Sequence, residues 1–346
     1  METMDAAAVS AEANPVLVEV TRGNMVESRH RAAVAVVDIE GRVILQAGEI
    51  EAPVYPRSAI KPLQALALVE SGAAEAFELG AAELALACAS HNGEPRHAET
   101  VGAWLARIGC SAEDLECGAH LPYHQESLEA LLRGGAAPST LHNNCSGKHA
   151  GFLSVARHLG HPTAGYIRYD HPVQQQVLGI LETLTGLDLS AAPRGIDGCG
   201  IPVLGMPLGN LALAMARFAQ PDDQPEARRA ACLRLQQALA AEPFMIAGSG
   251  RFCTRVIEAT KGRALVKTGA EGVFCGALPE LGLGFALKVD DGAGRAAEVA
   301  CGRVLRRLGV IGETETAALA AVFQPTLFNR AGRAVGELRT AADCPF

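Results

Sequence analysis

The fold is decided by residues 264–289, which read ALVKTGAEGVFCGALPELGLGFALKV. Three β-rich runs follow one another here with only short turn-forming segments between them, at Ala264–Lys267, Gly272–Leu278 and Leu283–Val289. This spacing is typical of an antiparallel meander. Three strands alone leave a hydrophobic face uncovered, so other strands and helices must pack around them.

The rest of the chain supplies both. Strand patterns occur at Val16–Val20, Ala32–Asp38 and Arg42–Ala47, whereas residues 58–262 are mainly helical, with a first helix at Ser58–Glu70. Two more helices are predicted after the meander, at Gly294–Leu308 and Glu313–Phe323. Strands from the two ends of the chain must meet in one sheet if either set is to bury a face.

We therefore predict an α/β (α+β) fold with a central antiparallel sheet, a helical subdomain and a helical cover. The sheet part comprises residues 15–57 and 263–346, and the mostly helical part comprises residues 58–262. Together they form a single domain over residues 15–346. Residues 1–14 are rich in Ala and acidic groups, and we expect them to form a disordered tail.

Composition excludes several classes of protein. The formal net charge of −8 argues against a nucleic-acid binder, which would carry a basic patch. No apolar run approaches the length of a membrane span. The ten cysteines are scattered over 346 residues, unlike the disulfide framework of a small secreted domain. The first residues lack the basic and apolar regions of a signal peptide, so we expect a reduced, cytoplasmic protein.

Three short motifs carry the predicted chemistry: Ser58-Ala59-Ile60-Lys61, Ser90-His91-Asn92 and Lys267-Thr268-Gly269. Each recurs by chance, and Ser58 alone is more simply read as a helix cap and Lys61 as a solvated lysine. Together, in this order, they approximate the S-x-x-K, S-D-N and K-T-G set of β-lactamases and penicillin-binding proteins, with His91 in place of Asp.

The motif order suggests an activated serine. A serine hydroxyl needs an adjacent base at neutral pH, and positions i and i+3 of a helical turn bring Ser58 and Lys61 to one face. If Lys61 is desolvated near a second cation, it accepts the serine proton more readily. Lys267 would be that cation, and Ser90 would relay a proton to the leaving group.

A second group of candidate residues lies in two turn-rich segments, Asn143–His149 and Gly195–Gly200. Cys145 and Cys199 could bind a borderline metal such as zinc as thiolates. Their spacing does not match a zinc motif, so two reduced cysteines in tight turns remain the simpler interpretation. Cys253, after a glycine-rich turn, is a weaker third candidate.

These segments resemble the asparaginase II family, the class 3 or rhizobial-type L-asparaginases. The resemblance rests on Arg57–Pro62, Cys88–His91, Asn143–His149, Asp197–Cys199 and Lys267–Ala270 and extends from about Val16 to the final helices. It implies a fold similar to serine β-lactamases and serine-type glutaminases, and a homodimer. It also implies two Ser–Lys pairs, Ser58 with Lys61 and Ser90 with Lys267.

The resemblance further implies a zinc ion (Zn2+) beside the serines, held by Cys145, Lys148 and Cys199 with a water. Arg57, His91, Asp197 and Cys253 would then lie around the substrate, with Asp197 just behind the metal ligands. The expected reaction is hydrolysis of L-asparagine to L-aspartate and ammonia, with Ser58 as nucleophile. Alternatives are a serine-type glutaminase, a β-lactamase or penicillin-binding-like hydrolase, and a zinc protein without activity.

Overall fold

The computed structural model describes residues 13–346, so most of the tail expected at 1–14 lies outside the described residues. Within them, Asn14 is hydrogen-bonded: its side chain donates to Asp290 and accepts from the backbone of Glu49. The strands are β1 (Val16–Arg22), β2 (Met25–Asp38), β3 (Val43–Ala47), β4 (Pro53–Val54), β5 (Arg194–Ile196), β6 (Pro202–Leu204), β7 (Met206–Pro207), β8 (Leu265–Thr268), β9 (Val273–Leu278), β10 (Leu283–Val289), β11 (Thr326–Phe328) and β12 (Ala334–Thr340).

Helices occupy most of the region between β4 and β8. The α-helices are α1 (Lys61–Gln64), α2 (Leu66–Glu70), α3 (Ala73–Ala76), α4 (Ala81–Ala87), α5 (Pro95–Arg107), α6 (Gln125–Arg133), α7 (Ser146–Leu159), α8 (Pro172–Thr185), α9 (Leu208–Ala219), α10 (Glu226–Ala241), α11 (Pro243–Ala247), α12 (Phe252–Thr260), α13 (Gly294–Arg307) and α14 (Glu313–Phe323). Short 3₁₀ turns are η1 (Arg57–Ile60), η2 (Ala112–Asp114), η3 (Thr140–His142) and η4 (Pro279–Leu281). No described helix is long and apolar enough to cross a membrane.

The main sheet is antiparallel and joins the two ends of the chain, as the sequence predicts. Its strand order is β11-β12-β1-β2-β10-β9-β8, with β3 also paired to β2. The long strand β2 pairs with β1 along its first half, at Met25–Arg31, and with β10 along its second half, at Ala32–Asp38. The predicted meander corresponds to β8, β9 and β10. The predicted α/β fold class is confirmed.

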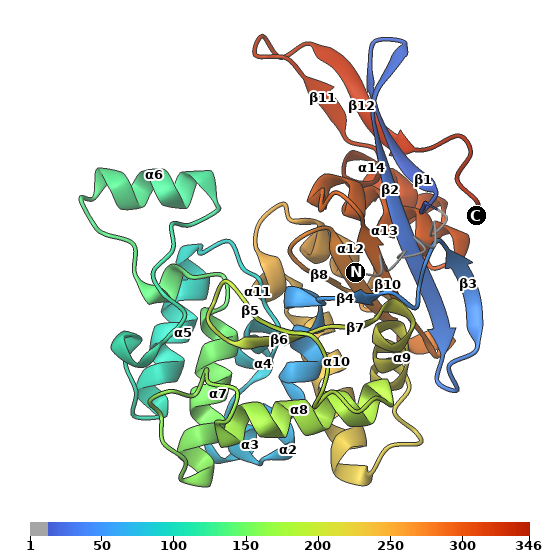
Figure 1. Ribbon diagram of the computed structural model, residues 1–346. Helices are drawn as coiled ribbons and strands as arrows, with labels where there is room; N and C mark the ends of the chain where they lie inside the picture. Colours follow the sequence, from blue (N-terminus) through green and yellow to red (C-terminus); the bar gives the residue numbers. More distant parts are fainter. Residues whose placement is uncertain (1–12) are drawn as a thin grey trace, which may run out of the picture.

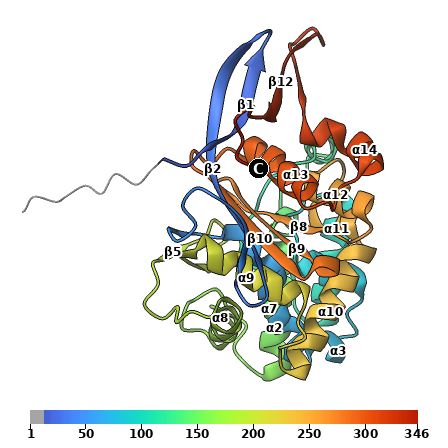
Figure 2. The ribbon, with the colours of Figure 1, turned by 90° about the vertical axis from the view of Figure 1, so that its right-hand side faces the viewer.

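Some helices pack against the sheet, and the others form a helical subdomain beside it. In Figure 1, α13 and α14 lie by the sheet, while α2–α5, α7 and α8 gather in the helical part. Figure 2 shows the same separation from the side, with β1, β2 and β12 rising above the helices. Helix α9 packs on β10, β2 and β9 and so connects the helical part to the sheet.

One local prediction was wrong, and three strand segments were missed. The helix expected at Ser58–Glu70 is instead the succession η1, α1 and α2, and Pro62 lies in the first turn of α1. The first half of β2 and the strands β11 and β12 were not predicted. Side chains of Met25–Arg31 alternate mainly between exposed and half-buried, because this part of the sheet projects from the core. Without a buried face, the segment lacks the apolar alternation by which strands are recognised.

Candidate active site

An open cleft lies where η1, the end of β8 and the start of α12 meet. It has a volume of about 550 Å³, within the usual range for small-molecule sites. It is lined by Ser58, Ser90, Asn92, Tyr123, His124, Gln125, Asn144, Ser249, Gly250, Arg251, Thr268, Gly269 and Ala270. Parts of all three sequence motifs therefore meet at one surface, although they are separated by up to about 200 residues.

The centre of this site is the Ser90 hydroxyl, which contacts two lysines. Lys267 Nζ donates to Ser90 Oγ at 2.8 Å, and Lys61 Nζ donates to it at 3.1 Å. Both lysine side chains are buried. Lys61 Nζ also donates to the carbonyl oxygens of Ala89 and Asn144. The two motif lysines are thus brought to the same serine.

Ser58 lines the same cleft, half-buried in η1, but is not joined to Lys61. Among the described residues, no hydrogen bond links the Ser58 hydroxyl to the Lys61 amine, which the loop after α4 and the Asn144–Cys145 segment engage instead. Gly269 explains how β8 approaches Ser58 so closely. A Cβ atom at Gly269 would lie 2.8 Å from the Pro56 carbonyl oxygen and 3.2 Å from the Ala59 nitrogen. Only glycine fits there without displacing η1.

Lys267 has an altered proton affinity. Burial, followed by the charge of Lys61, lowers the pKa of Lys267 to about 7. The ionisable groups around it are Lys61, Arg251, Cys88, Cys145, Cys253 and Cys275. Burial raises the pKa of Cys88, Cys253 and Cys275. Cys253 and Cys145, whose own pKa is lowered, raise the pKa of Lys267, but burial and the positive charges of Lys61 and Arg251 outweigh them. Lys267 is therefore suited to accept a proton from Ser90.

This property predicts the pH dependence of turnover. A base acts in its neutral form, so kcat/KM should rise with pH and level off above the pKa of Lys267, at about 7. Below that pH we expect a fall of about tenfold per pH unit. Steady-state rates between about pH 5 and 9 will check this, and a flat profile across that range would rule out Lys267 as the base.

Beside the serines, Cys145, Lys148 and Cys199 come together. Lys148 Nζ donates to Cys199 Sγ at 3.0 Å, and Lys61 Nζ donates to Cys145 Sγ at 3.2 Å. A hydrogen bond from Cys199, aided by Lys61 and Lys148, lowers the pKa of Cys145 well below its usual range despite burial. Among the described residues there is no cluster of three His, Cys, Asp or Glu side chains for a metal. Two sulfurs and an amine nitrogen nevertheless suit a borderline ion.

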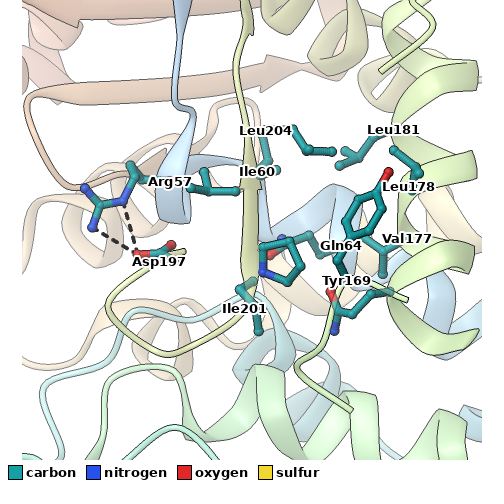
Figure 3. Close-up of a pocket in the computed structure, with 13 residues that line it drawn as sticks. Arg57, Ile60, Gln64, Tyr169, Val177, Leu178, Leu181, Asp197, Ile201 and Leu204 are labelled. Carbon is teal, nitrogen blue, oxygen red and sulfur yellow. Dashed lines mark hydrogen bonds and ion pairs between the residues drawn. The ribbon is translucent and has the colours of Figure 1, made fainter. Parts of the chain in front are cut away.

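Arg57 and Asp197 form an ion pair behind this site. Arg57 Nε and Nη2 donate to Asp197 Oδ1 at 3.1 and 3.0 Å. Figure 3 shows the pair at one side of a small cavity that Ile60 and Gln64 also line. Arg57 has a φ of +51°, a strained value for a residue other than glycine. Neither residue lines the larger cleft, so the pair fastens the Ser58 turn to the loop of Cys199.

His91 and Cys253, predicted to lie around the substrate, are in the interior. His91 is fully buried, and both its ring nitrogens have partners, the Gly93 backbone N–H and the Ser146 hydroxyl. Cys253 is also buried and does not line the cleft. Direct substrate contact by either does not fit this geometry. His91 instead fixes the position of Ser146, the residue after Cys145.

Sequence reasoning missed the opposite wall of the cleft. Asn92 accepts a hydrogen bond from Arg251 at 2.6 Å, and its backbone carbonyl accepts from Tyr123 and His124. Glu94 accepts from the backbone and hydroxyl of Ser249, both at 2.7 Å. Two features of the sequence could have indicated this wall: Asn92 is the third residue of the S-x-N motif, and Arg251 follows the glycine-rich turn before Cys253.

Comparison with known proteins gives one family match. The family model described as L-asparaginase II matches residues 18–340. No curated protein matches the chain. Similar crystal structures are Mglu in its native form with 4.3 M NaCl (15% identity, TM-score 0.46), a β-lactamase (Mb2281c) from Mycobacterium bovis (16%, 0.37) and the D-alanine carboxypeptidase AmpC from Burkholderia cenocepacia (12%, 0.41).

These alignments cover 82%, 84% and 80% of this chain, and 63%, 95% and 93% of the respective other chains. The match therefore spans less than two thirds of Mglu. Structural similarities of this size are too low to indicate an activity.

Proposed function

We propose that this amidohydrolase, a member of the L-asparaginase II family, hydrolyses L-asparagine to L-aspartate and ammonia. The observation that carries the proposal is the meeting of Lys61 and Lys267 at the Ser90 hydroxyl, in a cleft that Ser58 also lines. A hydroxyl beside a lysine with a pKa of about 7 is equipped for proton transfer at neutral pH.

In the proposed mechanism Ser58 is the nucleophile, and Ser90 with Lys267 moves the proton. The Ser58 oxygen bonds to the carbon of the substrate's side-chain amide, and the Ser58 proton passes through Ser90 to neutral Lys267. Lys267 returns that proton to the amide nitrogen as the carbon–nitrogen bond breaks and ammonia leaves. Water then hydrolyses the aspartyl ester on Ser58 by the same proton route in reverse.

The direct test is a comparison of substrates with the purified protein. We expect ammonia release from L-asparagine with a kcat/KM at least roughly tenfold above that for L-glutamine, because a site fitted to one chain length discriminates against an added methylene by that order. Nitrocefin should not be hydrolysed. Faster turnover of L-glutamine or of nitrocefin would replace the proposed reaction with that of a glutaminase or a β-lactamase.

We further propose that Cys145, Lys148 and Cys199 hold a zinc ion. The support is the donor set, two sulfurs and an amine gathered in a buried site next to Ser90. Zinc bound there supplies positive charge and Lewis acidity beside the cleft. The residues of the chain would retain the proton-transfer roles described above.

Replacement of Cys199 tests this metal site without reference to activity. Cys199→Ser should lose most of its zinc, because a neutral hydroxyl is a far weaker zinc ligand than a thiolate. The matched control is Cys110→Ser, a half-buried thiol with no part in the cluster, which should keep about one zinc per chain. Metal analysis of both purified variants decides the matter. Equal zinc content would contradict the assigned ligands.

We also propose that the protein is a homodimer, as the family resemblance implies, and that it is cytoplasmic, as its scattered cysteines suggest. Light scattering on the purified protein measures the mass of the assembly, and cell fractionation measures the location. A monomer at micromolar concentration would contradict the first statement.

A further inference from the structure

Arg251 stands on the wall of the cleft with an incomplete set of partners. Its Nη1 donates to Asn92 Oδ1 at 2.6 Å, and this is the one hydrogen bond of its guanidinium among the described residues. No described carboxylate lies within salt-bridge distance of it. Glu298 on α13 acts on Arg251 only through longer-range electrostatics, without a salt bridge. A cation in this position is available to an anionic ligand.

The turn that carries Arg251, at residues 248–251, is held firmly against the segment that contains Glu94. Gly248 has a φ of +106°, and a Cβ atom there would lie 2.3 Å from Glu94 Oε1. Glu94 in turn accepts from both the N–H and the hydroxyl of Ser249. Because the turn is held at several points, Arg251 is placed before any ligand arrives.

Asn92 fixes the orientation of the guanidinium. Its side-chain nitrogen donates to Glu94 at 3.3 Å and to the Ser249 carbonyl at 3.4 Å, so its oxygen is the atom directed at Arg251. Asn92 is itself buried. The amide thus holds one edge of the guanidinium and leaves its other N–H donors to the cleft.

We propose that Arg251, oriented by Asn92, binds the α-carboxylate of the amino-acid substrate. Arg251 lines the same cleft as Ser58, Ser90 and Thr268, so one ligand can touch both ends. A guanidinium fork matches a carboxylate and binds it more strongly than a neutral group would. The inference rests on the proposed function, because it assigns the end of L-asparagine that does not react.

The test compares two ligands that differ only in the α-carboxylate, L-aspartate and β-alanine. In Arg251→Met we expect L-aspartate to bind roughly 10- to 100-fold more weakly, the usual effect of losing a charged hydrogen bond. The affinity for β-alanine should stay the same. Arg255→Met is the matched control, since Arg255 lies one turn along α12 and donates to the Ala318 carbonyl instead. It should leave both affinities unchanged.

Steady-state kinetics provide a second test of the role of Arg251. In Arg251→Met the KM for L-asparagine should rise by the same factor while kcat changes less than roughly tenfold, because the lost contact is made in both ground and transition states. Equal weakening of both ligands, or none, would overturn the assignment, as would failure of the unaltered protein to bind L-aspartate. If L-aspartate binding depends on Arg251 but L-asparagine is not hydrolysed, the carboxylate site stands and the proposed reaction falls.

Discussion

Lys267→Met should lower kcat/KM for L-asparagine by roughly 10³-fold, within the range that general acid–base catalysis contributes. Lys267 is the one described lysine whose pKa falls to about 7, and its amine lies 2.8 Å from the Ser90 hydroxyl. Methionine has a similar length and no amine, so it removes the proton acceptor and leaves the packing nearly intact.

The same substitution should not lower the stability of the fold. A lysine whose pKa is lower in the folded state than in the unfolded chain destabilises the fold below about pH 7, and this effect disappears as the pH rises toward the ordinary lysine pKa of about 10.4. Lys267→Met should therefore melt at an equal or higher temperature than the unaltered protein, with the largest gain at acidic pH.

Thermal melting at about pH 6 and pH 9 measures the effect on stability, and ammonia release measures the effect on activity. Lys288→Met is the control, because Lys288 lies in the meander strand β10, which β9 separates from the strand of Lys267, and does not line the cleft. It should keep full activity. Activity of Lys267→Met within about tenfold of the unaltered enzyme would exclude Lys267 from proton transfer.

The sheet could be predicted to the extent that its strands are buried. The meander strands β8, β9 and β10 consist mostly of buried side chains, and their pattern is legible in the sequence. The strands β11 and β12 carry mainly exposed or half-buried residues and were missed. Exposed strands are held by their neighbours' backbone hydrogen bonds, which leave no periodic pattern in side-chain polarity.

The site could be predicted as a set of residues but not as a set of contacts. Motif order led to both serines and both lysines, yet the pairing of Ser58 with Lys61 by helical spacing assumed a regular first turn. That turn is 3₁₀, and the Lys61 amine reaches Ser90, 29 positions away. Arg251 was missed for a similar reason, because its place depends on Ser249 bonding to Glu94 across 155 positions.

The convergence of two lysines on Ser90 raises the question of which serine attacks the substrate, and Ser58→Ala answers it. We expect this variant to lose roughly 10⁴-fold or more in kcat, the scale seen when a serine nucleophile is removed. Ser90→Ala should lose less, roughly 10²-fold, because a water can replace a relaying hydroxyl. Ser190→Ala, an exposed serine outside the cleft, is the control and should keep full activity.

The decisive measurement is to identify the serine that carries the covalent intermediate. Rapid acid quenching of the enzyme with L-asparagine, followed by peptide mass spectrometry, should find the aspartyl ester on the peptide that contains Ser58. The ester should be absent from Ser58→Ala and present at a lower level in Ser90→Ala, where proton transfer is slower. An ester on Ser90 would reverse the two roles. Ser90 would then be the nucleophile, activated directly by Lys267, and Ser58 would only line the cleft.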